Sequence, residues 1–376
     1  MDQVDSLRAF AMTAVIAEHC KIMPFGWMGV WLFFVISGFV VTTSLVSRPA
    51  TSAKGLLSGF YARRAARILP IYLAYVLIGF LVSALGEGRF AWAQLASLIL
   101  FFNNFQSAFA VGVFRHFPVG HLWTLSVEMQ FYLVFGFAFA FLSRRTLVAG
   151  LIGLLFLAPL LRWAGGMWLD NAGFVPLRAA FAVYTFSPMH FDSFAFGCLL
   201  ALAPSPWRKS RRSIALLLAG MAAMAVYAAF YVCVNHVHHA AGLKMLKNVI
   251  SGILFGEGRQ IWLYTTVAVL SAGVLATTLG GQAPWAIATR SPLVQAVGRA
   301  SYGGYLYHAF CVTQARALLR ATIHFGPGPI GKLEFGLGVF ALALPATIAV
   351  SLFSYHYVER PVIAAANRRL ARSAGS

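Results

Sequence analysis

Runs of apolar residues alternate with short polar segments along nearly the whole chain. Most of these runs approach the ~20 residues that an α-helix needs to cross a bilayer. The pattern therefore predicts an all-α polytopic integral membrane protein with ten transmembrane helices, at residues 7–23, 27–46, 68–85, 121–142, 146–163, 179–203, 214–234, 260–280, 301–320 and 335–357. A further apolar run at 91–104 is shorter, so we expect a re-entrant or interfacial segment there.

The composition excludes a soluble protein. Of the 376 residues, 60% are hydrophobic and 10% are charged, whereas about 25% of the residues in a typical soluble domain are charged. The N-terminus has neither the basic segment nor the small-residue cleavage site of a signal peptide. We therefore expect the first apolar segment to remain in the mature protein.

The net charge of +19 predicts a membrane topology and no nucleic-acid partner. The basic residues lie in short loops between apolar segments, which is typical of the cytoplasmic loops of membrane proteins. If the run at 91–104 does not cross, five basic groups share one side, and both termini are cytoplasmic in a bacterial inner membrane. These groups are Arg48, Lys54, Arg63, Arg64 and Arg67; Arg144 and Arg145; Arg208, Lys209, Arg211 and Arg212; Arg290 and Arg299; and Arg368, Arg369 and Arg372.

The first apolar helix carries an arginine and a histidine on one face. Arg8 and His19 are eleven residues apart, which is three helical turns plus about 20°, and about 16 Å along the axis. Such a polar stripe is costly in a membrane unless it faces protein or a water-filled path. The predicted topology places Arg8 near the cytoplasmic face and His19 toward the outer face.

A basic cluster precedes the third predicted helix. Arg63, Arg64 and Arg67 have the spacing i, i+1, i+4, and guanidinium groups bind phosphate oxygens in pairs. The cluster suits either a topology anchor or a binding site for a phosphorylated cytoplasmic ligand. Arg8 has the same expected depth, which favours the binding site.

Three acidic residues, Glu18, Glu128 and Asp192, fall in or at the edge of predicted helices, and Glu128 lies about seven residues into its helix from the outer side. An acid inside a membrane is a candidate functional residue. Its expected depth matches that of His19, so we predict that Glu128 orients the imidazole; pairing with a structural arginine is the alternative. Glu18 lies about 100° around the helix from His19, so we expect it to face another neighbour. Asp192 is expected to pair with a polar partner such as Arg178.

Other polar residues receive weaker predictions. Ser37 with Gly38 suits tight helix packing or, for Ser37, a pore lining. His308 is a candidate wall of the cytoplasmic entrance. The four cysteines lack paired spacing and the histidines of 235–239 lack nearby carboxylates, so we expect neither disulfides nor a metal.

In this order, the stretches resemble the membrane acyltransferase family 3, which includes O-antigen and nodulation-factor O-acetylases. The resemblance runs from Asp5 to Pro361. The matching pieces are Arg8 and His19 with ten residues between them, FFVISGF (33–39), FYARRAARILP (60–70), HLWTLSVEMQFY (121–132), SYGGYLYH (301–308) and VERP (358–361).

The resemblance implies an O-acyltransferase that moves an acyl group, commonly acetyl, from cytoplasmic acyl-CoA to a hydroxyl of a carbohydrate or lipid-linked glycan. It implies a catalytic role for His19 and places Arg8, Arg63, Arg64 and Arg67 on the donor side, with Glu128 at the family's characteristic glutamate. We expect an acyltransferase domain at 1–361, a basic tail at 362–376 and no C-terminal esterase-like domain.

Two mechanisms and one other class of protein remain open. His19 acts either as the general base or as a covalent acyl carrier. Buried charges also suit a proton-coupled transporter or flippase of a glycan, although the sequence shows no inverted repeat. The acceptor, the acyl chain length, the side on which the acceptor binds and the oligomeric state are not determined by the sequence.

Overall fold

The computed structural model describes residues 2–48, 52–88, 90–109, 114, 116–203, 210–253, 256–281, 283 and 285–375, and all regular elements in these ranges are helical. The longer helices are α1 (Asp2–His19), α2 (Met28–Val46), α3 (Ala53–Glu87), α6 (Trp123–Phe141), α7 (Arg144–Asn171), α11 (Ser210–Val237), α13 (Arg259–Leu279), α16 (Ser301–Thr322) and α17 (Gly328–Ser354). The shorter ones are α4 (Trp92–Ile99), α5 (Asn103–Phe109), η1 (Gly120–Leu122), α8 (Pro176–Thr185), η2 (Ser187–His190), α9 (Phe191–Leu202), α12 (Gly242–Ile250), α14 (Ala286–Thr289), α15 (Pro292–Arg299), η3 (Tyr355–Glu359) and α18 (Arg360–Gly375).

The chain is an all-α polytopic membrane protein, as predicted, but the expected number of ten spans is not confirmed. Within the described ranges, seven helices are long and apolar enough to cross a membrane. They cover Met28–Val46, Ala53–Glu87, Gly120–Phe141, Arg144–Asn171, Arg211–Val237, Arg259–Leu279 and Gly328–Arg372. Arg208 and Lys209, which the sequence analysis assigned to a basic loop, lie outside the described residues.

The three remaining predicted spans differ for two physical reasons. The runs at 7–23 and 301–320 form α1 and α16, which both carry charged residues. Helix α1 and the N-terminal half of α16 also pack among other helices. The run at 179–203 is broken into α8, η2 and α9. Pro188 lies at the start of η2, and a proline cannot donate the amide hydrogen bond of a continuous helix.

The apolar run at 91–104 forms two short helices, α4 and α5, of eight and seven residues. Eight residues extend only about 12 Å, far less than the ~30 Å of a bilayer core. The C-terminal turn of α4 is held against α3 because the Tyr72 hydroxyl donates to the Leu98 carbonyl, 2.9 Å away. Neither helix alone is long enough to cross the membrane.

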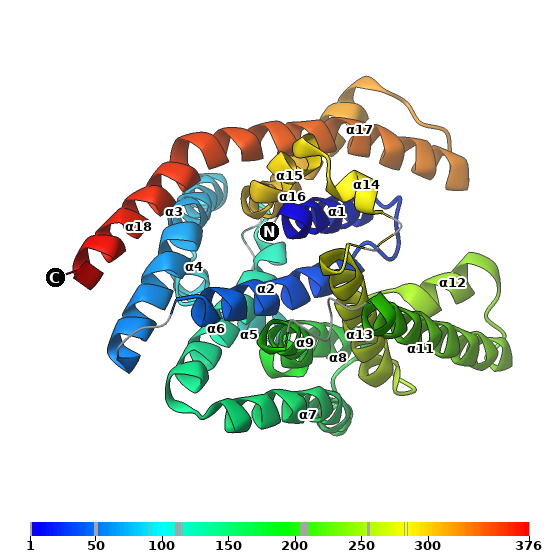
Figure 1. Ribbon diagram of the computed structural model, residues 1–376. Coiled ribbons are helices and arrows are strands. Elements are labelled where there is room, and N and C mark those ends of the chain that lie inside the picture. The colour runs from blue at the N-terminus through cyan, green and yellow to red at the C-terminus, as the bar shows by residue number, and fades with distance from the viewer. Residues whose placement is uncertain are drawn as a thin grey trace.

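Helix α1 lies in the interior of the bundle and positions the site. Figure 1 shows it between α2 on one side and α15, α16 and α17 on the other, and it contacts each of these helices. At the left of the same view, α18 continues the long α17 through η3 and lies against α3. The residues expected to form a basic tail, from 362 onward, are thus helical through Gly375.

Helices α2 and α9 approach each other at two glycines. A Cβ atom at Gly38 would lie 2.1 Å from the Phe194 carbonyl oxygen, and one at Gly197 would lie 1.9 Å from that of Val35. No larger residue fits at such separations, so the packing predicted for Gly38 is confirmed. The neighbouring Ser37 instead lines a cavity.

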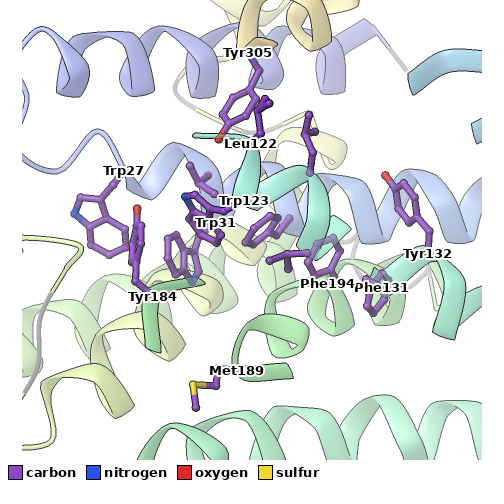
Figure 2. Close-up of a cluster of buried hydrophobic side chains, with 14 of the residues drawn as sticks. Trp27, Trp31, Leu122, Trp123, Phe131, Tyr132, Tyr184, Met189, Phe194 and Tyr305 are labelled. Atoms are coloured by element: carbon purple, nitrogen blue, oxygen red, sulfur yellow. The ribbon is translucent and has the colours of Figure 1, made fainter. Parts of the chain in front are cut away.

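Aromatic side chains fill the centre of the bundle beside this contact. Trp31 stacks on Tyr264 with 5.0 Å between ring centroids, and Phe131 stacks on Phe194 at 4.3 Å. Figure 2 shows Trp31 among the rings at one end of this cluster, and the Tyr132 hydroxyl pointing away from the Phe131–Phe194 stack. Close aromatic packing therefore surrounds the polar groups described next.

A buried ion pair joins α7 to α9. Arg162 Nη2 lies 2.8 Å from Asp192 Oδ2, and both side chains are fully buried. The same nitrogen donates to Thr265 Oγ1 of α13 at 2.6 Å. The predicted pairing of Asp192 with Arg178 is wrong, because Arg178 is exposed on α8 whereas α7 passes directly beside α9.

Candidate functional site: three cavities between an arginine cluster and His19

The N-terminal half of α1 and the middle of α3 together line an arginine-rich cavity, which we call the arginine cavity. Arg8 comes from α1, and Arg64 and Arg67 come from α3. The remaining wall is mostly apolar and aromatic and consists of Val30, Phe33, Phe34, Ser37, Ile68, Thr124, Leu125, Glu128, Tyr132, Ser301, Tyr302 and Tyr305. Three guanidinium groups around one carboxylate leave an excess of positive charge, which favours an anionic ligand.

A second cavity, the entrance cavity, adjoins the first and has a volume of about 320 Å³. It also contains Arg64 and Arg67, so these two arginines line both spaces. Arg48 and Arg63 add two further cations, and the C-terminal helix α18 contributes Ile363, Ala366 and Asn367. Four arginines therefore line the route into the arginine cavity.

A third cavity, the His19 cavity, has a volume of about 410 Å³ and lies at the C-terminal end of α1. Val30 and Tyr305 line both this cavity and the arginine cavity. The other lining residues are Val15, Glu18, His19, Lys21, Pro118, Gly120, His121, Trp123, Phe181, Tyr184, Ile253, Ala309, Val312, Thr313 and Arg316. The three cavities thus adjoin one another in series between the arginines and His19, with Val30 and Tyr305 between the arginine cavity and the His19 cavity.

Glu128 lies at the arginine end of this series. Its Oε1 accepts hydrogen bonds from the Ser37 and Tyr132 hydroxyls, and its side chain lines the arginine cavity. Arg8 of the same cavity is about 16 Å along α1 from His19. The structure therefore does not bring Glu128 to His19, and the expected orienting contact is corrected: the carboxylate lies at the level of the arginines and bonds to Ser37 and Tyr132.

Three histidine rings from three elements gather beside the third cavity. The His308 ring lies 4.8 Å from the His19 ring and 4.9 Å from the His121 ring, both in edge-to-face orientation. His308 was expected to form a wall of the entrance beside the arginines, but α16 places it against His19. His121 and His308 are buried, whereas His19 is partly exposed to the cavity.

Backbone contacts fix the position of His19. Arg316 Nη2 of α16 donates to the His19 carbonyl oxygen, one of the free carbonyls at the end of α1. The Tyr305 hydroxyl accepts from Thr124 Oγ1 at 2.8 Å and donates to the His121 carbonyl at 3.2 Å. These bonds hold the wall that separates the arginine cavity from the His19 cavity.

Sequence reasoning missed Glu18 and Arg316 as residues of the His19 cavity. Glu18 was expected to face elsewhere because it lies about 100° from His19 on the helix, but the cavity is wide enough to reach both. Arg316 sits within an apolar run, and a charged residue in such a run was the available signal. The sequence did not mark Tyr305 as a cavity residue, since tyrosines are common in membrane helices.

The histidine tract at 235–239 lies elsewhere, at the end of α11. His238 Nε2 lies 2.9 Å from Glu257 Oε1, and Arg259 contacts the same carboxylate. In the described part of the chain, no group of three or more His, Cys, Asp or Glu side chains could hold a metal ion.

A family model described as an acyltransferase domain matches residues 1–356. Over 380 residues the chain is 24% identical to "O-acetyltransferase OatA" of Staphylococcus aureus, covering 96% of this chain and 56% of that protein. It is 25% identical over 385 residues to "Peptidoglycan O-acetyltransferase OatA" of Listeria monocytogenes, covering 96% and 55%, respectively. The chain thus spans about half the length of the curated relatives that it matches. No solved structure matches.

Proposed function

Because the chain belongs to the acyltransferase family whose model matches residues 1–356, we propose that it transfers an acyl group from acyl-CoA to a hydroxyl of a carbohydrate. The observation that carries the proposal is the series of adjoining cavities, which has an arginine cluster at one end and a partly exposed histidine at the other. A phosphorylated donor and a general base are the two groups that such a transfer requires.

The arginines hold the donor in this proposal. Arg48, Arg63, Arg64 and Arg67 bind the phosphates of acyl-CoA from the entrance cavity, because guanidinium groups form charge-assisted hydrogen bonds to phosphate oxygens. The slender pantetheine arm then extends through the arginine cavity and past Val30. The ~16 Å between Arg8 and His19 is on the scale of that arm.

His19 carries out the transfer. Its unprotonated nitrogen takes the proton from the acceptor hydroxyl as the oxygen attacks the thioester carbonyl. The new C–O bond forms, the C–S bond breaks, and the proton passes from the imidazolium to the leaving thiolate of CoA. In the covalent variant, His19 itself attacks the thioester and then passes the acyl group to the hydroxyl.

Glu128 acts at the donor end and not at the reacting atoms. Its carboxylate, held by Ser37 and Tyr132, balances part of the charge of Arg8 and its neighbours before the donor binds. Without such a counter-charge, several guanidinium groups facing one cavity repel one another. Glu128 thereby keeps them in place for the donor.

The acceptor enters the His19 cavity. Trp123, Tyr184 and Tyr305 offer aromatic faces there, and Glu18 and Arg316 offer polar groups for hydroxyls. The relatives named as peptidoglycan O-acetyltransferases favour a carbohydrate polymer or its lipid-linked precursor as acceptor, and acetyl as the transferred group. We place the protein in a bacterial inner membrane with the arginines toward the cytoplasm, where acyl-CoA is made.

The test is release of free CoA thiol by the purified protein in nanodiscs, with acetyl-, propionyl- and succinyl-CoA and a peptidoglycan-derived glycan. We expect release by the wild type, none above background by His19→Ala, and full release by His324→Ala, which removes an exposed histidine far along the chain. Equal release by His19→Ala and the wild type would contradict the role of His19. Glycan movement without thioester cleavage would favour the transporter instead.

A further inference from the structure

His308 is a buried histidine with one nitrogen bonded and the other without a partner. Its Nδ1 lies 2.6 Å from the Tyr305 carbonyl oxygen. A carbonyl oxygen can only accept, so Nδ1 carries the hydrogen and, in the neutral ring, Nε2 carries a lone pair. Within the described residues, Nε2 is buried and has no hydrogen-bond partner.

His121 shows the same arrangement with the two nitrogens exchanged. Its Nε2 lies 3.0 Å from the Leu306 carbonyl oxygen, so Nε2 donates and Nδ1 carries the lone pair. That Nδ1 is also buried without a partner among the described residues. Two acceptors cannot bond to each other, so the adjacent His121 and His308 rings cannot satisfy one another. Any donor to these nitrogens therefore comes from a third group.

His19 is the donor that the geometry offers. In an in-line hydrogen bond between two imidazoles the ring centroids are about 5.3 Å apart, because N···N is about 2.9 Å and each nitrogen lies roughly 1.2 Å from its centroid. The observed separation of the His19 and His308 centroids, 4.8 Å, is slightly shorter and suits a bent hydrogen bond. A rotation of the partly exposed His19 ring within its cavity brings an N–H toward His308 Nε2, and catalytic bonds often tighten only when substrate binds.

We propose that His308 is the positioning residue for His19. Its Nε2 accepts the N–H of His19, which selects the His19 tautomer whose other nitrogen faces the acceptor hydroxyl. The same bond stabilises the imidazolium once the proton is taken. A neutral histidine thus fills the role that a carboxylate has in a Ser-His-Asp triad, and the inference rests on the proposed function.

Two substitutions separate this role from a structural one. His308→Asn keeps a donor for the Tyr305 carbonyl at the position of Nδ1 but has no acceptor at the position of Nε2. His308→Gln places its amide oxygen near the position of Nε2. We expect kcat to fall on the order of 100-fold in the asparagine variant and to recover to within about tenfold of wild type in the glutamine variant, with donor KM unchanged in both.

His190→Gln is the matched control. His190 is also fully buried, with Nε2 3.0 Å from the Val183 carbonyl and Nδ1 unpartnered in the described structure, but it does not line the His19 cavity. We expect wild-type kcat for this variant. Binding of CoA to each variant, measured by calorimetry, shows that the protein is folded.

Three results would overturn the proposal: wild-type kcat in His308→Asn; a raised donor KM with kcat unchanged, which would make His308 a donor-binding residue; or equal loss in the asparagine and glutamine variants while CoA binding persists. A wild type that opens no thioester with any acceptor would instead refute the proposed function. If His308→Asn no longer binds CoA, the test rests on His308→Gln alone. Recovery of kcat in His308→Gln supports the proposal, and full loss of its kcat contradicts it.

Discussion

Replacing Arg67 by glutamine should weaken donor binding by a predictable amount. Arg67 lines both the entrance cavity and the arginine cavity, so it is placed to meet a phosphate of any donor that passes between them. A hydrogen bond to a charged partner contributes about 1.5–3 kcal/mol. Since each 1.4 kcal/mol is about tenfold in affinity, we expect the Kd for CoA to rise roughly 10- to 150-fold.

The assay is calorimetric titration of CoA into the protein in nanodiscs, at two salt concentrations. The control is Arg145→Gln, which removes an exposed arginine at the start of α7 and should leave Kd unchanged. The affinity difference between wild type and Arg67→Gln should shrink as salt rises, because screening weakens the lost interaction.

Repeating the titration with dephospho-CoA, which lacks the 3′-phosphate, identifies the phosphate that Arg67 contacts. If Arg67 binds the 3′-phosphate, the Kd of wild type and of Arg67→Gln should differ for CoA and agree for dephospho-CoA. An equal difference in Kd for both ligands would assign Arg67 to the diphosphate. A change in Kd of less than about threefold with both ligands, under ~0.7 kcal/mol, would refute the assignment of the arginines to the donor.

Two further predictions concern the core and the path. Arg162→Met should destabilise the protein by about 3–5 kcal/mol because it leaves the carboxylate of Asp192 buried without its partner. In thermal unfolding, the double variant Arg162→Met with Asp192→Leu should regain most of the lost stability. Equal loss of stability in the single and double variants would contradict this explanation. Val30→Phe should narrow the junction of the arginine and His19 cavities and lower kcat by about 100-fold, with CoA affinity unchanged. The control Leu318→Phe, at an exposed position, should leave kcat and CoA affinity unchanged. An unchanged kcat in Val30→Phe would exclude this route for the donor.

The individual polar residues of the site could be predicted because charges inside apolar runs are costly. Arg8, His19, Arg64, Arg67 and Glu128 each line one or more of the joined cavities. Periodicity relates residues along one helix, so the shared stripe of α1 was visible in the sequence.

Contacts between helices could not be predicted in the same way. Helical periodicity does not fix the rotation of α6 against α1, so depth alone wrongly suggested that Glu128 meets His19. It likewise could not show that α16 turns His308 toward His19, or that Asp192 pairs with Arg162. Such pairings depend on packing between segments far apart in the sequence, such as the glycine contact of α2 with α9.

The count of ten spans was not confirmed for a related reason. A hydropathy window measures how well a helix suits lipid, whereas α1 and the N-terminal half of α16 are surrounded largely by protein and need not be apolar. The same window overlooks a single proline, so the run at 179–203 looked continuous although Pro188 lies in the first turn of η2 within it.

The most direct test of the account is a structure of the protein with an acyl-CoA analogue whose thioester sulfur is replaced by a methylene group. The account predicts that the phosphates contact Arg64 and Arg67 and that the pantetheine arm passes Val30. It also predicts that the reacting carbonyl lies roughly 3–4 Å from the His19 ring, close enough for a hydroxyl bound beside His19 to attack it. A carbonyl that remains in the entrance cavity, with the His19 cavity empty, would contradict it.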